Sequence, residues 1–184
     1  MDVPILYEDN HLLLVQKPVN IPVQEDQSGD KDLLTYLKED IKYRYQKPGN
    51  VYLGLVHRLD RPVGGTMVFA KTSKVASRLS DQVRRNAMER TYLAVVNGKP
   101  GQASNRLVDY LYKNRQKNKV SIISEHHKEG KKAVLDYSVS ASKDGLSLVS
   151  VQLQTGRPHQ IRVQLAGLGT PIWGIKNMVN NIVK

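Results

Sequence analysis

The chain has 184 residues, 28 Lys+Arg against 17 Asp+Glu, no cysteine, and a net charge of +11 with a pI of about 9.8. The lack of cysteine excludes disulfides, thiolate catalysis and cysteine-ligated zinc. No run approaches the roughly 20 apolar residues of a membrane-spanning helix, and the N-terminal residues lack the basic and apolar regions of a signal peptide. We therefore expect a cytoplasmic protein with one core of ordinary size.

The charge is unevenly distributed along the chain. Residues 1–40 hold nine acids and three lysines, whereas residues 41–184 hold 25 Lys+Arg and eight acids. A basic excess confined to part of a chain points to a polyanionic partner, and nucleic acid is the commonest one. The alternative is that the charge serves colloidal solubility, and charge alone barely separates the two.

The first half of the chain alternates short apolar runs with polar turns. Leu33, Leu37 and Ile41 have helical spacing, and Asp30 or Asp32 can cap that helix. In chain order, the pattern predicts strands at 5–8 and 11–16, a loop at 22–31, a helix at 32–45, and strands at 51–56 and 66–70.

The second half combines a helix, a basic segment and a hairpin. Lys143-Asp-Gly145 is a hairpin turn signal between two apolar runs. We expect a helix from Thr72 or Ser73 to about 86, a strand at 91–96, a basic hairpin or loop at 113–132, strands at 133–140 and 146–154, and a helix at 157–168. The sum is a mixed α+β fold with a mainly antiparallel sheet and flanking helices, in one domain spanning residues 1–184.

The segment His57-Arg58-Leu59-Asp60-Arg61-Pro62 places one carboxylate between two arginines at a turn between predicted strands. Opposite charges nearby lower the pKa of a carboxyl group, so Asp60 would be held ionised. An ionised carboxylate in a cationic site suits a nucleophile that acts on a polyanion. A surface ion cluster is the alternative, and these six residues alone favour it.

Two further segments offer chemistry. Arg157 and Arg162 bracket His159 at the predicted start of a helix, an arrangement that attracts phosphate, although ordinary surface arginines would produce the same pattern. Tyr92 is either half-buried core or an aromatic that stacks on a base. The histidines lack metal-ligand spacing and His57 and His159 lie close to arginines, so we expect no metal.

Taken together, four segments in order resemble the RluA-type pseudouridine synthases. The resemblance lies in residues 5–18, which end in Lys-Pro, in Val56-His-Arg-Leu-Asp-Arg-Pro-Val-Gly-Gly65, in Glu89-Arg-Thr-Tyr92 to Gly98, and in Thr155-Gly-Arg-Pro-His-Gln-Ile-Arg162 to Ile172. Gly64 stands where the family has Ser or Thr, and Asn20 stands where it usually has Gly.

The resemblance implies a cofactor-independent isomerase that converts specific uridines to pseudouridine in structured ribosomal or transfer RNA. The target nucleotide would be flipped out, because its glycosidic bond is otherwise unreachable. By the family pattern Asp60 is the catalytic aspartate, by a nucleophilic or a glycal route, Tyr92 packs on the base and Arg162 pairs with the aspartate. The expected substrate-binding residues are His57, Arg58, Arg61, Arg157, His159 and Leu165, with Arg58 associated with base flipping and Leu165 in the pocket wall.

The chain is short compared with the family pattern. After Gly174 the family continues with an Asp, usually a Tyr-Gly, and further strand and helix, and we expect no S4-like RNA-binding domain before the catalytic domain. These departures motivate a second hypothesis, an RNA-binding protein of this fold that has lost catalysis. A glycosidase would need a second catalytic carboxylate, and the basic half offers no obvious one near these motifs. We expect a monomer with no obligate protein partner.

Overall fold

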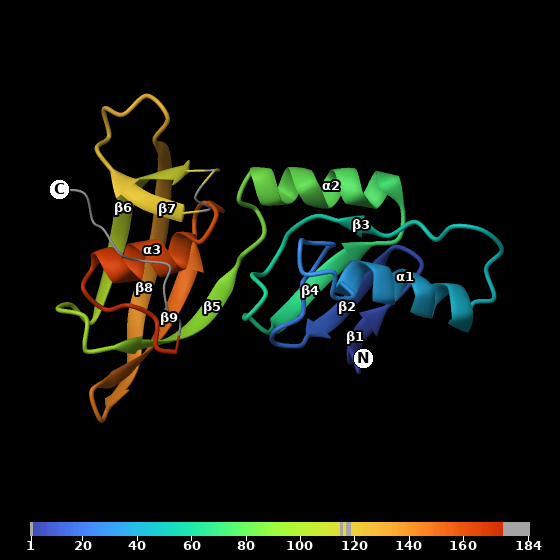
Figure 1. The fold of residues 1–184 in the computed structure, drawn as a ribbon, viewed down its shortest axis with the longest axis horizontal. Coiled ribbons are helices and arrows are strands. Elements are labelled where there is room, and N and C mark those ends of the chain that lie inside the picture. Colours follow the sequence, from blue (N-terminus) through green and yellow to red (C-terminus); the bar gives the residue numbers. More distant parts are fainter. Residues whose placement is uncertain (1, 115, 117–118, 175–184) are drawn as a thin grey trace. The chain divides into compact units, whose positions relative to one another are not determined.

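The computed structural model describes residues 2–114, 116 and 119–174. The chain divides into two compact units, Met1–Met88 and Glu89–Lys184, each with its own sheet (Figure 1). Every strand pair in the described residues is antiparallel, and helices flank both sheets, so the predicted α+β class is confirmed. The single domain over residues 1–184 stays a prediction. The segment after Gly174, where the sequence leaves the family pattern, lies outside the described residues.

The first unit contains a small sheet and two helices. Asp32 caps the first helix by accepting the Thr35 N–H (3.0 Å), and Thr72 caps the second by accepting the Val75 N–H (3.3 Å). The sheet order is β1-β2-β4-β3. The elements are β1 Ile5–Glu8, β2 Leu12–Lys17, α1 Leu33–Arg44, β3 Gly54–Leu55, β4 Gly65–Ala70 and α2 Ser73–Arg84.

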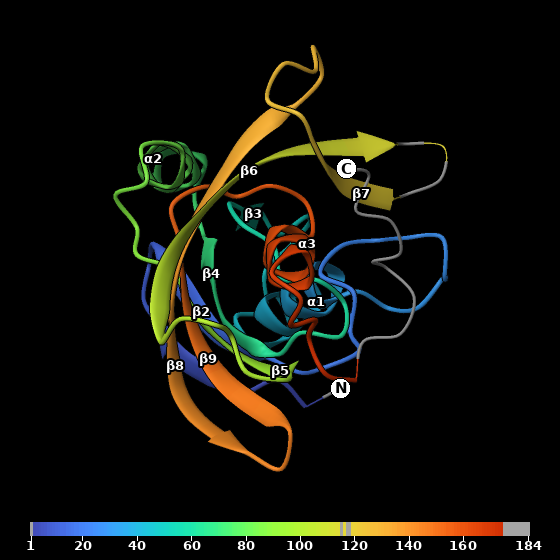
Figure 2. The same cartoon turned by 90° about the vertical axis from the view of Figure 1, so that its left-hand side faces the viewer.

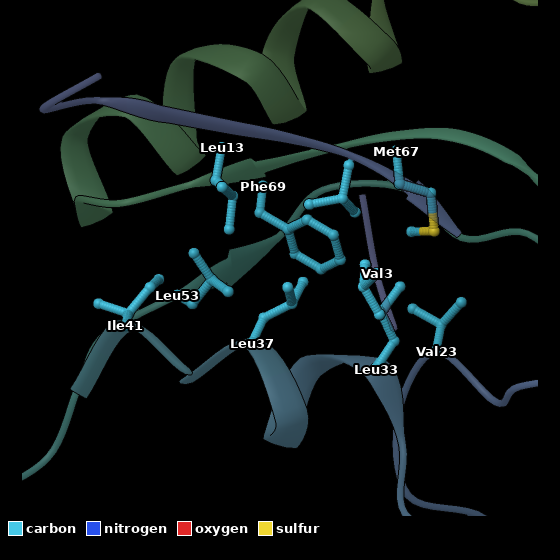
Figure 3. Close-up of a cluster of buried hydrophobic side chains, with 10 residues drawn as sticks. Val3, Leu13, Val23, Leu33, Leu37, Ile41, Leu53, Met67 and Phe69 are labelled. Carbon is cyan, nitrogen blue, oxygen red and sulfur yellow. The ribbon is translucent and has the colours of Figure 1, made fainter. Parts of the chain in front are cut away.

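The core of the first unit lies between α1 and one face of the sheet. Leu33, Leu37 and Ile41 recur at every fourth position, which places them on one side of α1. Alternate residues of β2 and β4, such as Leu13 and Phe69, point toward them, and α2 lies on the other side of the strands (Figure 3). The sheet therefore has a helix on each face, and both predicted helices of this unit are confirmed.

The strand expected at 51–56 is shortened to β3, which pairs with β4 only at Gly54 and Leu55. At the next position of β4, the N–H of Val68 donates to the ring Nε2 of His57 (3.1 Å) instead of to a backbone carbonyl. A side chain thus takes the hydrogen bond that would have extended the ladder, and the chain turns away from the sheet.

The second unit contains five strands in the order β5-β9-β8-β6-β7 and one described helix. Three of the strands match the predictions. The basic segment predicted at 113–132 contains β7, and the partner of β7, β6, lies almost entirely before that segment and was not predicted. The elements are β5 Thr91–Asn97, β6 Ser104–Asn114, β7 Lys119–Ile123, β8 Lys131–Lys143, β9 Leu146–Leu153 and α3 Gln160–Gly167.

The sheet of the second unit curves around α3 (Figure 2). Leu165 of α3 is fully buried against side chains of the central strands, among them Leu135, Val149 and Val151. The helix begins three residues later than predicted, because Pro158 and His159 form its entry and His159 is in the left-handed region (φ 51°). Of the described helices, none has both the length and the apolar character to cross a bilayer.

Candidate active site

Asp60 lies in the turn between β3 and β4, as the sequence predicted. The turn is closed by the Val63 N–H, which donates to the Asp60 carbonyl oxygen (2.9 Å). The Asp60 side chain is half-buried. The backbone is anchored by β3 before the turn and by β4 after it, so the position of the Asp60 backbone is fixed on both sides.

Lys17, the last residue of β2, lies beneath this turn with only 1% of its surface exposed. Its Nζ donates to the carbonyl oxygens of Pro18 (2.9 Å), Arg61 (3.1 Å) and Val63 (2.8 Å). Burial lowers the pKa of Lys17 to about 8, the charge of Asp60 opposes that shift, and the charge of Arg61 adds to it. The lysine therefore remains largely charged at neutral pH, ties the turn to β2, and interacts electrostatically with Asp60.

Sequence reasoning assigned Lys17 no role in the site. One signal was present: Leu13, Val15 and Lys17 alternate along a strand, and the first two belong on its buried face. A lysine at the next inward position must find acceptors for its ammonium, because a buried charge without hydrogen bonds is very costly.

Two departures from the family pattern have local explanations. Asn20, where the family usually has Gly, adopts φ 64°, a conformation that Asn tolerates better than most residues. At Gly64, a Cβ atom would lie 3.1 Å from the Val19 side chain and 3.3 Å from the Lys17 carbonyl oxygen. The space that a Ser or Thr side chain would need is therefore restricted here by the branched side chain of Val19.

The two arginines beside Asp60 both reach a loop between β2 and α1. Arg58 donates to Oε1 of Gln24 (3.4 Å), and Arg61 donates to Oγ of Ser28 (2.9 Å) and pairs with Asp30. The sequence predicted that these guanidinium groups keep Asp60 ionised. The partners described for Arg61 are loop residues, and Lys17 is a further cation whose charge is coupled to Asp60 from the core side, so the effect of the two arginines on Asp60 stays a prediction.

The second unit carries the other predicted catalytic residues. Tyr92 lies in β5 opposite Val151 of β9 and is half-buried against the core. Arg162 lies on α3 and is buried, with 7% of its surface exposed. Leu165, expected in the pocket wall, is fully buried, and its part in a pocket stays a prediction.

A network of neutral side chains anchors the segment around α3. Oε1 of Gln160 accepts the Thr155 hydroxyl (2.8 Å) and the Arg157 N–H (3.0 Å). Its Nε2 donates to the Val134 carbonyl oxygen (3.1 Å) and to Oε1 of Gln164 (2.9 Å). All hydrogen-bonding groups of this buried amide thus have partners, which fixes the loop on β8. The sequence did not mark Gln160 and Gln164 as anchors, because polar residues on a short helix usually indicate its exposed side, and Thr155 lies in the polar loop before that helix.

Arg157 and His159 precede α3 instead of lying in its first turn. Nε of Arg157 donates to the Lys132 carbonyl oxygen (2.9 Å), and the carbonyl oxygen of His159 accepts the Val163 N–H (3.0 Å). Both residues are therefore held by the backbone of β8 or α3. The prediction of a phosphate-attracting helix start is wrong in its boundary, although an arginine still flanks the N-terminus of α3.

The candidate site residues fall into two groups. His57, Arg58, Asp60 and Arg61 belong to the first unit, and Tyr92 with the 157–165 residues belongs to the second. A common cleft containing Asp60 and Arg162 stays a prediction. Among the described residues, no three His, Asp or Glu side chains gather in a way that could hold a metal ion.

The family model for RNA pseudouridylate synthase matches residues 11–167, so the chain belongs to this family, and the resemblance drawn from the motifs is confirmed. The matched region includes Lys17, the Asp60 turn, Tyr92 and Arg162.

Particular relatives agree with this family. The chain is 36% identical over 176 residues to the uncharacterized RNA pseudouridine synthase YhcT of Bacillus subtilis, covering 94% of this chain and 56% of that protein. It is 31% identical over 179 residues to the ribosomal large subunit pseudouridine synthase C of Buchnera aphidicola, covering 95% and 55%. The chain thus spans about half the length of these relatives.

Among solved structures, the chain is similar to human RNA pseudouridylate synthase domain containing 4. The TM-score is 0.82 at 25% sequence identity, with 96% of this chain and 69% of that chain covered. The similarity extends across both units and supports the assignment of the fold.

Proposed function

We propose that this chain isomerises specific uridines to pseudouridine in RNA, with Asp60 as the catalytic carboxylate. The observation that carries the proposal is the family match over residues 11–167, in which Asp60 occupies a turn anchored by the buried Lys17. Tyr92 and Arg162 take the roles that the family pattern implies, packing on the base and pairing with the aspartate.

The chemistry requires a carboxylate but no redox step. The bond between N1 of uracil and C1′ of the ribose breaks, and positive charge develops on the sugar. Asp60 captures or stabilises that charge, which an ionised carboxylate does directly. The base then rotates, C5 bonds to C1′, a proton leaves C5, and N1 regains a proton. The reaction is balanced within the substrate, so no cofactor is needed.

We propose large-subunit ribosomal RNA as the substrate, with transfer RNA as the other class that the family resemblance implies. Support comes from the relatives named ribosomal large subunit pseudouridine synthases, among them the Buchnera aphidicola protein. The net charge of +11 is consistent with any RNA and does not separate the two classes.

The test is pseudouridine mapping in total RNA from cells that lack the gene, treated with the purified wild-type chain or with Asp60→Asn. The wild type is expected to form pseudouridine at a small number of uridines, and Asp60→Asn should reduce formation there to background. Asn keeps the size of the side chain and removes the charge. Glu39→Gln, which neutralises an exposed carboxylate of the same unit, is the matched control and should behave as wild type.

Other outcomes separate the readings. Pseudouridine formation by Asp60→Asn at the wild-type rate contradicts the role of Asp60. Salt-sensitive RNA binding by the wild type with no isomerisation on any RNA contradicts the enzyme and favours the RNA-binding protein that has lost catalysis.

A further inference from the structure

The two arginines that flank Asp60 are both engaged by residues 24–30, which we call the acidic loop. Arg61 donates to Ser28 Oγ (2.9 Å), pairs with Asp30, and lies 3.8 Å from Oδ2 of Asp26. Arg58 reaches the beginning of the same loop through Gln24 (3.4 Å). The arginine expected to meet an RNA phosphate therefore already has two carboxylates beside it.

The acidic loop is held by hydrogen bonds within itself. Asp26 Oδ1 accepts both the N–H (2.9 Å) and the hydroxyl of Ser28, and the Ser28 hydroxyl oxygen accepts the Asp30 N–H (3.2 Å). Gly29 adopts φ +73°, which this turn requires. The Ser28 hydroxyl and N–H lower the pKa of Asp26, and the charge of Arg61 lowers it further. Asp26 is therefore ionised at neutral pH.

The net positive charge lies mainly in the second unit of the chain. Residues 1–88 hold 13 Lys+Arg and 11 Asp+Glu, whereas residues 89–184 hold 15 and 6. General attraction to RNA thus comes mainly from the second unit. In the first unit, a phosphate near Asp60 meets the repulsion of Asp26 and Asp30 at the same place as the attraction of Arg61.

We propose that Asp26 and Asp30 are specificity-determining residues: they compete with RNA phosphates for Arg61 and penalise RNA that reaches the Asp60 turn by charge alone. Repulsive groups that disfavour wrong partners are a general source of selectivity. A correct substrate offsets the penalty with contacts that a random RNA lacks. This inference rests on the proposed function, since it takes RNA as the substrate.

The test uses a random-sequence single-stranded RNA of 20 nucleotides as the non-specific probe. In Asp26→Asn/Asp30→Asn the competition disappears, so the probe should bind about tenfold more tightly at 0.1 M salt. The plot of log affinity against log salt should steepen by about 0.7, the contribution of one added phosphate contact on a single strand. Asn at position 26 still accepts the Ser28 hydrogen bonds, so the loop should remain folded.

Two companion variants identify the cause. Asp2→Asn/Glu39→Gln removes the same charge from the first unit, at exposed residues that have no described contact with Arg61. It should change the affinity for the probe less than threefold and leave the slope of log affinity against log salt unchanged. Adding Arg61→Gln to Asp26→Asn/Asp30→Asn should cancel the steeper slope, because the added phosphate contact belongs to Arg61. Asp30→Asn alone should give part of the increase in affinity for the probe, and it replaces the double variant in the test if the double variant folds poorly.

A second readout concerns selectivity. In total RNA, Asp26→Asn/Asp30→Asn should form pseudouridine at more uridines than the wild type. The inference is overturned if the loop variant matches the Asp2→Asn/Glu39→Gln control in affinity and slope, or if the steeper slope survives Arg61→Gln. If the wild type forms pseudouridine while the loop variant matches the control, this inference alone fails. If the wild type neither binds RNA nor forms pseudouridine, the proposed function fails.

Discussion

The two segments that carry the candidate catalytic residues are held in place by different kinds of interaction. The Asp60 turn is held by charged groups, with the Lys17 ammonium on the core side and the Arg61 pairs with the acidic loop on the outer side. The 155–162 segment is held by a hydroxyl and amides, chiefly Thr155 and Gln160. The difference predicts that pH will affect the support of the Asp60 turn far more than the support of the 155–162 segment.

The largest effect is expected at Lys17. Lys17→Met keeps the length of the side chain but removes the donor of three partly buried hydrogen bonds, to the carbonyl oxygens of Pro18, Arg61 and Val63. The free energy of unfolding should fall by about 2–4 kcal/mol. Each carbonyl oxygen left without a donor costs about 1–3 kcal/mol, and part of this cost is offset because Met, unlike Lys, places no charge in the interior. Urea denaturation at pH 7 measures it. Lys42→Met, at an exposed lysine of α1, is the control and should change it little.

The pH dependence sharpens the same prediction. Below about pH 8 Lys17 is protonated in both the folded and the unfolded chain, whereas between about 8 and its ordinary 10.5 only the unfolded chain keeps the proton. The unfolded state then binds more protons, so the free energy of unfolding of the wild type rises with pH in this range. Lys17→Met lacks that rise, and the gap between the two proteins should widen from pH 8 to pH 10. If the difference in free energy of unfolding between wild type and Lys17→Met stays constant over this range, the lowered pKa of Lys17 is contradicted.

A smaller effect is expected at Glu8, whose carboxylate joins β1 to the end of α1. It accepts from Lys71 (2.7 Å), Arg44 (2.8 Å) and the Tyr45 hydroxyl (3.1 Å). Burial alone would raise the pKa of Glu8, but these hydrogen bonds outweigh it and hold the pKa below its ordinary value. Glu8→Gln should lower the free energy of unfolding at pH 7 by about 1–3 kcal/mol, because charge-assisted hydrogen bonds are lost.

The sign of the pH effect is opposite to that at Lys17. A lowered carboxyl pKa gives stability that is present above pH 4.5 and is lost as the pH falls through the folded value. The difference between wild type and Glu8→Gln should therefore shrink at acidic pH in urea denaturation. Glu39→Gln removes an exposed pair with Lys31 and should cost at most about 1 kcal/mol. If Glu8→Gln and Glu39→Gln lower the free energy of unfolding equally, the burial of the hydrogen bonds at Glu8 adds nothing to stability.

The elements of the first unit were largely predictable because their signals are local. Leu33, Leu37 and Ile41 mark one side of a helix, and Asp32 and Thr72 act as caps within three residues of the groups they bind. Asp60 was predictable as well, since a charged motif between two apolar runs must lie in a turn.

The supports of the site were not predictable, because their partners are distant in sequence. His57 shortens β3 by accepting the N–H of Val68, and Lys17 finds acceptors 44 and 46 residues away. Gln164 donates to Asp109 (2.7 Å) across 55 residues. Only the folded strands bring these groups together, so polar residues that hold the core resembled surface residues in the sequence.

The smallest effect, and the one that isolates the neutral support, is expected at Thr155. Its hydroxyl accepts the Val134 N–H (2.8 Å) and donates to Gln160 Oε1 (2.8 Å). Thr155→Val keeps the shape and removes both hydrogen bonds, so the free energy of unfolding should fall by about 1–2 kcal/mol, whereas Thr155→Ser keeps the hydroxyl and should cost less. Urea denaturation of the three proteins measures both losses.

The Thr155→Val loss should be the same at pH 6 and pH 9 and at 0.1 M and 1 M salt, because neither group of the pair titrates or carries charge. Over the same alkaline range the gap for Lys17→Met widens. If the Thr155→Val loss instead changes with pH or salt, the 155–162 segment depends on charged groups as the Asp60 turn does, and the contrast between the two supports is wrong.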